Sequence, residues 1–230
     1  GILVVFDGKS LAGALPLGKG VSLAFSGQTS GHRFLSPEKI SISNSITYVT
    51  KLKSAKVIPD PAERRTLIWA QCRDRALKEN LTVKADEGLL DEVTGLVEWP
   101  VVLMGKIDQQ FMSVPPEVLT TSMRTHQKYF ALLDKQGNLA PRFLLVSNME
   151  TKDKGAQIVA GNERVLRARL SDAKFFWEQD LKVRLAGRLP ALADIIFHAK
   201  LGSVAQKVAR MKALAAHLAK SIPDADPAMA

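Results

Sequence analysis

Apolar residues along the chain repeat at two different periods, which predicts a protein of both strands and helices. Alternating or short continuous apolar runs predict strands over residues 2–6, 21–25, 40–49, 101–107, 128–133 and 142–148. Apolar positions three and four residues apart predict helices over residues 60–80, 87–97, 115–124, 156–179 and 203–220. The turn-rich residues 134–138 join the last two strands, which are therefore expected to form a hairpin.

The composition of the chain changes near residue 186. Strands and helices are mixed before that point, whereas the sequence from Leu189 onward is rich in Ala, Leu and Lys and has no further strand signal. We therefore expect an α/β fold of the α+β type, with one mixed domain over residues 1–185 and the truncated start of a helical domain over residues 186–230. The chain begins inside a strand-like run without an initiator methionine, which favours an internal piece of a longer protein.

The charge and composition of the chain limit which classes of function it can have. The 230 residues carry a net charge of +9, which permits a polyanionic partner without proving one. Most of the surplus falls in residues 163–220, where 12 Lys and Arg stand against five Asp and Glu. A single cysteine, no secretion signal and no apolar stretch near the ~20 residues that span a bilayer predict a cytoplasmic protein without a membrane segment.

Short motifs argue against several kinds of enzyme site. Residues 13–20 nearly match a phosphate-binding loop, but Gly20 replaces the required Ser or Thr and a strand-like run follows in place of a helix. The four histidines lack metal-site spacing and no Cys-x-x-Cys is present, so no metal site is predicted. Cys72 falls on the apolar side of a predicted helix, which favours a buried structural thiol. No catalytic residue is assigned.

A basic segment at residues 123–130 is the first candidate for RNA contact. If the segment is extended, Arg124, His126 and Lys128 share one face, because side chains alternate along a strand. Arginine offers a planar fork to a phosphate and lysine a point charge. The competing interpretation is a solvated strand edge whose charges discourage aggregation.

A basic stripe on the helix predicted over residues 156–179 is the second candidate. Arg164, Arg167, Ser171 and Lys174 follow one another at steps of three and four residues, with Arg169 at the border of the apolar face. A cationic helix face can follow a phosphate backbone. Acidic residues are interspersed along the same helix, so ion pairs within the helix are the competing interpretation.

Four longer strings resemble a known family, the beta subunits of bacterial heterotetrameric glycyl-tRNA synthetases. The resemblance covers the chain to about residue 220 and matches an internal part of that subunit. The strings are Gly95-Leu96-Val97-Glu98-Trp99-Pro100, Met123-Arg124-Thr125-His126-Gln127-Lys128-Tyr129-Phe130, Ala160-Gly161-Asn162-Glu163-Arg164-Val165-Leu166-Arg167-Ala168-Arg169-Leu170 and Phe197-His198-Ala199-Lys200-Leu201-Gly202.

The resemblance implies a module similar to the B3/B4 domain of the phenylalanyl-tRNA synthetase beta subunit, followed by a helical domain similar to HD proteins. It also implies an α2β2 enzyme that joins glycine to tRNA(Gly), with ATP and Mg²⁺ used on the alpha subunit. Under this hypothesis the chain binds tRNA without catalysing the reaction. The RNA-facing candidates are Arg124, His126, Lys128, Arg164, Arg167, Arg169 and Lys174.

Two other roles stay open. The basic faces could dock the alpha subunit or other parts of the beta subunit, which would make the chain an assembly module. The B3/B4-like domain could also be a vestigial editing domain. Editing is the weaker alternative, because glycine is the smallest amino acid and a tight pocket can exclude every larger one by steric clash.

Overall fold

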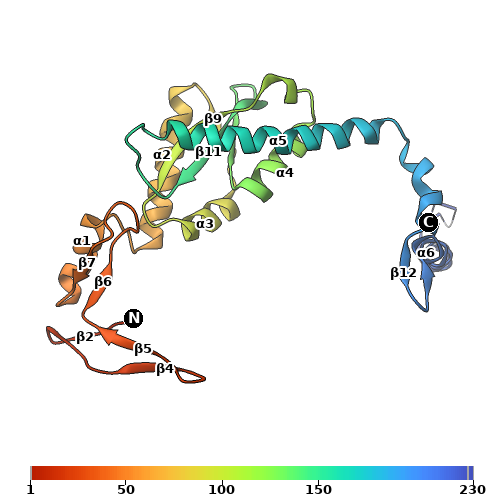
Figure 1. Cartoon of the computed structure of the whole chain (residues 1–230). Coiled ribbons are helices and arrows are strands. Elements are labelled where there is room, and N and C mark those ends of the chain that lie inside the picture. The colour runs from red at the N-terminus through yellow and green to blue at the C-terminus, as the bar shows by residue number, and fades with distance from the viewer. Residues whose placement is uncertain (1, 227, 230) are drawn as a thin grey trace. The chain divides into compact units, whose positions relative to one another are not determined.

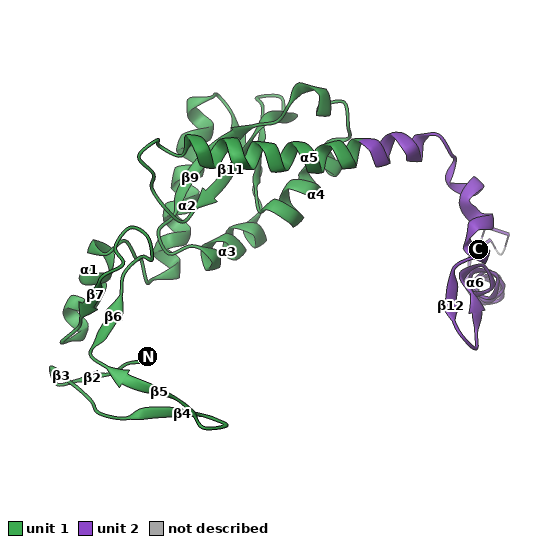
Figure 2. Cartoon of the chain, viewed as in Figure 1, with its two compact units in different colours: residues 1–174 green, residues 175–230 purple. Residues whose placement is uncertain are grey.

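The computed structural model describes residues 2–226 and 228–229. The chain divides into two compact units, residues 1–174 and residues 175–230, and the division falls inside the long helix α5, Ala156–Leu181 (Figures 1 and 2). Both strands and helices are present, so the predicted mixed α/β class is confirmed at this level. The predicted domain identities, over residues 1–185 and 186–230, stay predictions.

Short antiparallel strand pairs dominate the first 41 residues. Strands β1, β5 and β4 form one sheet in that spatial order, while β2 pairs with β3 and β6 with β7. The segment that nearly matches a phosphate-binding loop forms β4 and the turn into β5, with Lys19 and Gly20 at positive φ. The strands are Ile2–Leu3 (β1), Val5–Phe6 (β2), Lys9–Ser10 (β3), Ala14–Gly18 (β4), Val21–Ser26 (β5), Gln28–Ser30 (β6) and Lys39–Ser41 (β7).

The strand predicted over residues 40–49 is wrong for most of its length. Strand β7 ends at Ser41, and helix α1 runs over Ser45–Ser54. Asn44 caps this helix, because its side-chain oxygen accepts the backbone N–H of Thr47 at 2.9 Å. The β-branched and aromatic residues of the segment favour a strand only weakly, and the cap together with the burial of Leu52 outweighs that preference.

A four-stranded antiparallel sheet with two helices forms the core of the first unit (Figure 1). Its strands lie in the order β8, β10, β11, β9, and β10 pairs with β11 as the predicted hairpin. Helices α2 and α3 pack on this sheet through Ile68, Cys72 and Leu90. The elements are Pro61–Lys78 (α2), Thr82–Val83 (β8), Glu87–Leu96 (α3), Val101–Lys106 (β9), Phe130–Leu133 (β10) and Leu139–Ser147 (β11).

Helix α2 begins as its sequence predicts. Asp60 is the N-cap and accepts the Ala62 N–H at 2.8 Å, while Pro61 occupies the first helical position, where no N–H is needed. Cys72 is fully buried on the core side, and burial raises the pKa of its thiol to about 12. The structural role predicted for this cysteine agrees with that environment.

Residues 124–128 are not extended, so the condition under which Arg124, His126 and Lys128 would share one face is not met. Helix α4, Pro116–Ser122, continues into a π-helical turn, Met123–Gln127, and Lys128 takes a left-handed conformation with φ of 59°. The strand begins only at Phe130. Burial explains this geometry, because the turn places both Met123 and Tyr129 inside the unit. A short 3₁₀ turn, Gln109–Phe111 (η1), precedes α4.

After the last residues of α5, the second unit continues with a 3₁₀ segment, a small strand pair and a helix. These are Leu185–Ala193 (η3), Ile196–His198 (β12), Gly202–Ser203 (β13) and Val204–Ala219 (α6). The β12–β13 pair contradicts the expectation of no strand after Leu189, and Gly202 at φ of 83° permits its turn. Helix α6 was predicted over residues 203–220 and starts with a capping box formed by Ser203 and Gln206. Among the described residues, no helix is both long and apolar enough to cross a membrane.

Candidate RNA-contact surface and the Arg124 cavity

Arg124 lies in an ion pair within the folded unit. Its Nε donates to Asp86 Oδ2 at 2.5 Å and its Nη2 donates to Oδ1 at 3.4 Å. Asp86 also caps helix α3 by accepting the Leu89 N–H at 2.8 Å. The guanidinium of Arg124, aided by this backbone N–H, holds the pKa of the Asp86 carboxyl below its usual range. Asp86 therefore stays ionised and fixes the orientation of Arg124.

The two other basic candidates of the segment differ from each other. Lys128 Nζ lies 2.6 Å from Glu92 Oε1 of α3, so its charge is matched within the unit. His126 is exposed, and within residues 2–226 and 228–229 its ring makes no hydrogen bond or ion pair. The π-helical turn therefore leaves His126 open to a partner while it ties Arg124 and Lys128 to α3.

Tyr129 and Asn162 join this segment to helix α5. The Tyr129 hydroxyl donates to Asn162 Oδ1 at 2.5 Å, and burial raises the pKa of this phenol to about 12. The neighbouring Glu163 accepts the Lys106 N–H at 2.8 Å, which satisfies a backbone donor of the edge strand β9. Two residues of the long family-like string on α5 thus serve the fold.

The basic stripe on α5 divides into bound and open positions. Arg167 pairs with Asp108, with bonds of 2.6 Å and 3.2 Å, and this pairing lowers the pKa of the Asp108 carboxyl. Lys174 Nζ donates to the Gln110 carbonyl at 3.2 Å. Arg164 and Arg169 are exposed and make no hydrogen bond or ion pair within the described part of the chain. The alternative of ion pairs within the helix is wrong for Arg167, whose partner lies 59 residues away.

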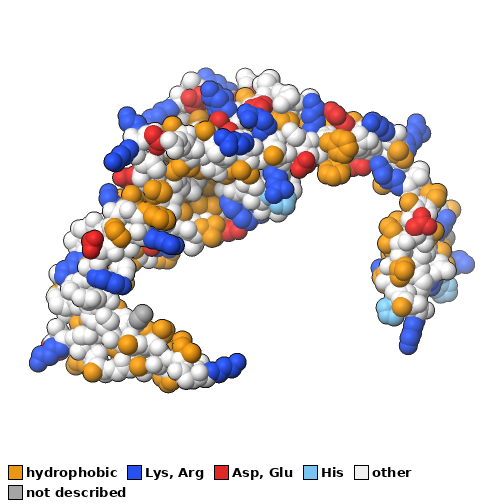
Figure 3. Space-filling model, in the orientation of Figure 1, with side chains coloured by type: hydrophobic (Ala, Val, Ile, Leu, Met, Phe, Trp, Pro, Cys, Tyr) orange, Lys and Arg blue, Asp and Glu red, His pale blue; other side chains and the backbone are white. Residues whose placement is uncertain are grey.

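Positive and negative side chains are mixed on the face of the molecule drawn in Figure 3. On the face drawn in Figure 3, the Lys and Arg side chains of α5 are interspersed with Asp and Glu and do not form one uninterrupted patch. Among the seven predicted RNA-facing residues, the structure leaves His126, Arg164 and Arg169 open and gives partners to the other four. Any contact with RNA by this surface would therefore use few positions.

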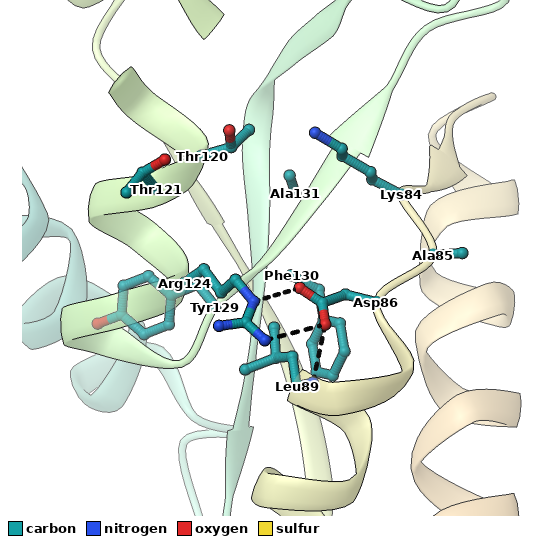
Figure 4. A pocket seen from close by; sticks show the side chains of 10 residues that line it. All are labelled: Lys84, Ala85, Asp86, Leu89, Thr120, Thr121, Arg124, Tyr129, Phe130 and Ala131. Carbon is teal, nitrogen blue, oxygen red and sulfur yellow. Dashed lines mark hydrogen bonds and ion pairs between the residues drawn. The ribbon is translucent and has the colours of Figure 1, made fainter. Parts of the chain in front are cut away.

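A cavity of about 230 Å³ lies beside Arg124 (Figure 4). Helix α4, the turn after it, the connection from β8 to α3 and strand β10 form its walls. Lys84 and Thr120 lie toward one end, Arg124 and Asp86 toward the other, and Ala131 lies between them. We call this the Arg124 cavity; its lining residues are Lys84, Ala85, Asp86, Leu89, Thr120, Thr121, Arg124, Tyr129, Phe130 and Ala131.

The sequence patterns missed the acidic partners and the cavity. No spacing pattern marks Glu92 or Asp108 as a partner, and Asp86 is marked only by its place just before a predicted helix, where an N-cap is common. The sequence does not mark Lys84 as a site residue, because a single lysine in a loop between a strand and a helix is common. Across the described residues, no three His, Cys, Asp or Glu side chains form a group that could hold a metal ion.

The Arg124–Asp86 pair predicts a dependence of stability on acid. The folded state lowers the pKa of Asp86, so the pair contributes fully above the unfolded value of about 4 and its contribution is lost as the pH falls through the folded pKa. We expect the free energy of unfolding, measured by urea at a series of pH values, to fall less steeply in acid for Asp86→Asn than for the wild type. Asparagine keeps a good N-cap, so a slope identical to the wild type would contradict this role of the carboxylate.

Comparisons with known proteins give a consistent picture. A family model described as glycyl-tRNA synthetase beta subunit matches residues 2–230. The glycine–tRNA ligase beta subunit of Rhodospirillum centenum is 52% identical over 96% of the chain and 34% of the relative. The corresponding proteins of Neisseria meningitidis and Dinoroseobacter shibae are 48% and 52% identical over 99% and 86% of the chain. The chain spans about a third of the length of these curated relatives.

Proposed function

Because the chain belongs to the family of glycyl-tRNA synthetase beta subunits, we propose that it contacts tRNA(Gly) for an enzyme that attaches glycine to that tRNA. The exposed guanidinium groups of Arg164 and Arg169 on α5 are the observation that carries this proposal. An exposed arginine without a carboxylate partner is available to a phosphate, and its fork can bind two phosphate oxygens. His126 adds a third open donor.

Under this proposal, a partner subunit and not this chain catalyses the reaction. We propose that the alpha subunit of an α2β2 enzyme in the cytoplasm uses ATP and Mg²⁺, and that this chain supplies RNA contacts from a B3/B4-like domain followed by the start of an HD-like helical domain. The residues that line the Arg124 cavity include no histidine, cysteine or serine that could act as a nucleophile or base. The one carboxylate of the lining, Asp86, is held by Arg124 and the Leu89 N–H, so the cavity offers hydrolytic editing no free carboxylate as a base.

Charge reversal on α5 tests the proposal. We expect Arg164→Glu with Arg169→Glu to weaken binding of a tRNA(Gly) transcript about tenfold or more, because two phosphate contacts become repulsive. The slope of log affinity against log salt should fall by about two. Fluorescence anisotropy over a salt series measures both quantities. Arg167 is left unchanged, because its pair with Asp108 would mix stability into the result.

A second pair of arginines provides the matched control. Arg73 and Arg75 on α2 are exposed and make no ion pair within the residues that the structure describes, so Arg73→Glu with Arg75→Glu changes the net charge by the same amount. A general loss of positive charge would weaken both variants equally. Equal affinities and equal salt slopes for the two variants would overturn the assignment of the α5 face.

Assembly is the rival function, and one observation favours it. Arg124, Lys128 and Arg167 are all paired with carboxylates, so much of the basic surface already has partners inside the unit. Under this rival the remaining open cations dock the alpha subunit. A chain that co-elutes with the alpha subunit but does not bind the tRNA transcript would favour assembly over RNA contact.

A further inference from the structure

Some polar groups that line the Arg124 cavity already have hydrogen-bond partners within the protein, and others do not. Asp86 is the one acidic residue among those that line the cavity, and its carboxylate already accepts two bonds from Arg124 and one from the Leu89 N–H. The Tyr129 hydroxyl is likewise engaged, since it donates to Asn162 outside the cavity. The Asp86 carboxylate, the strongest hydrogen-bond acceptor in the lining, is therefore already bound by groups of the protein.

The remaining polar groups of the cavity are mainly donors. A guanidinium has five N–H groups, and Arg124 spends one on Nε and one on Nη2, so the edge formed by Nη1 and Nη2 stays free for a second bidentate acceptor. Lys84 Nζ makes no hydrogen bond or close ion pair in the described chain, although its charge helps to lower the pKa of the Asp86 carboxyl, and the hydroxyl of Thr121 makes no hydrogen bond. The carboxylate of Asp86 holds Arg124 in place without consuming that free edge.

The two cationic groups lie toward opposite ends of the cavity. Figure 4 places Lys84 and Thr120 at one end and the guanidinium at the other, with the small Ala131 side chain between them. Leu89 and Phe130 line the cavity beside Asp86 and Arg124 and are almost fully buried. A ligand that binds both cationic groups carries an oxygen-rich anionic group toward each of them.

We propose that the Arg124 cavity binds phosphate groups of a nucleotide chain, one at the Nη1–Nη2 edge of Arg124 and one at Lys84. A nucleotide chain carries successive phosphates joined through a sugar and so offers an anionic group to each of the two donor sites, and phosphate oxygens accept the bidentate bonds that arginine offers. The preferred source is a strand of RNA, and in that form the inference rests on the proposed function. A free phosphate compound is the other source of the same chemistry.

Binding of two probes by the full chain tests the proposal: a single-stranded uridine tetranucleotide and inorganic pyrophosphate. Lys84→Ala should weaken binding of the tetranucleotide about tenfold, as expected for the loss of one charge-assisted contact. Lys135→Ala is the matched control, because Lys135 is an exposed lysine in the β10–β11 turn and its loss changes the net charge equally. This control should change the affinity less than about twofold.

A second variant tests the other end of the cavity. Arg124→Lys keeps a cation beside Asp86 but removes the free fork, so it should weaken tetranucleotide binding several-fold while the thermal midpoint stays close to that of the wild type. Pyrophosphate binding that depends on Lys84, without tetranucleotide binding, would support the free compound as the source. Binding of both probes that is insensitive to Lys84, or equal losses for Lys84→Ala and Lys135→Ala, would overturn the proposal.

The two proposals fail separately. If reversal of Arg164 and Arg169 leaves tRNA affinity unchanged while Lys84→Ala weakens tetranucleotide binding, the α5 assignment is wrong and the cavity assignment stands. If the α5 variant weakens tRNA binding and Lys84→Ala acts like Lys135→Ala, the cavity assignment is wrong and the proposed function stands.

Discussion

Replacing Phe143 with alanine is expected to lower the free energy of unfolding of the first unit by about 3–5 kcal/mol, the range for a large aromatic side chain removed from a core. Phe143 is fully buried on β11, and its ring stacks on Tyr129 with the ring centroids 4.5 Å apart. It lies opposite Gly105 of β9 in the strand register. Urea unfolding followed by circular dichroism measures the change.

A substitution at Gly105 tests one particular contact of Phe143, the packing of its ring against this glycine. A Cβ atom built on Gly105 would lie 2.4 Å from Cζ of Phe143, so the ring covers the glycine and leaves no room for a side chain. Gly105→Ala alone should therefore destabilise the unit by about 1–3 kcal/mol through overpacking. In the Phe143→Ala background the same change should be neutral or stabilising, because the ring is gone and alanine suits a strand better than glycine.

A double-mutant cycle of these two changes gives the coupling directly. If the two losses simply add, the close approach of the ring to Gly105 is not what fixes glycine at that position. Phe143→Leu is the milder control, since it keeps an apolar side chain of intermediate volume and should lose less stability than Phe143→Ala.

The helices that the sequence predicts well are those with local signals at their ends. Asp60 and Pro61 mark the start of α2, and Ser203 with Gln206 marks the start of α6. Such caps act over three or four residues, so the sequence alone contains them. Helix α1 was missed although Asn44 caps it, because the alternating apolar residues after Asn44 match the pattern of a strand equally well.

The candidate site was only partly predictable for a different reason. The basic residues could be found from their spacing, but whether each is open depends on carboxylates far away in the sequence. Arg124 meets Asp86 across 38 residues and Arg167 meets Asp108 across 59. Only the fold brings these partners together, so sequence spacing could not separate Arg164 from Arg167. The π-helical turn at residues 123–127 is likewise set by tertiary burial of Met123 and Tyr129.

Loss of His32 is the second change from which we expect a large effect. The ring is buried, and its Nε2 lies 2.6 Å from the carbonyl oxygen of Asn148, just after β11. Its Nδ1 accepts the backbone N–H groups of Phe34 and Leu35, at 3.2 Å and 3.1 Å. A nitrogen that accepts these bonds carries no proton, so the proton lies on Nε2 and is donated to Asn148.

This arrangement makes His32 a link between the amino-terminal segment and the core sheet. Asn148 is itself anchored, because its side-chain oxygen accepts the N–H groups of Glu98 and Trp99 at 2.7 Å and 2.9 Å. One histidine thus satisfies three backbone groups that belong to two distant parts of the sequence. Buried backbone groups without partners are costly, so the effect of removing the ring should exceed that of losing its volume.

His32→Phe keeps an aromatic ring, of somewhat larger volume, and removes every hydrogen bond that the imidazole makes. We expect it to lower the free energy of unfolding by about 3 kcal/mol or more, since a carbonyl and two N–H groups lose their partner at once. His32→Gln should lose less, because its amide can still donate to Asn148. Urea unfolding gives the size of the effect, and faster amide exchange at Phe34 and Leu35 in His32→Phe locates it. A phenylalanine variant as stable as the wild type would mean that solvent or a rearranged loop replaces these bonds, and the histidine would not be such a link.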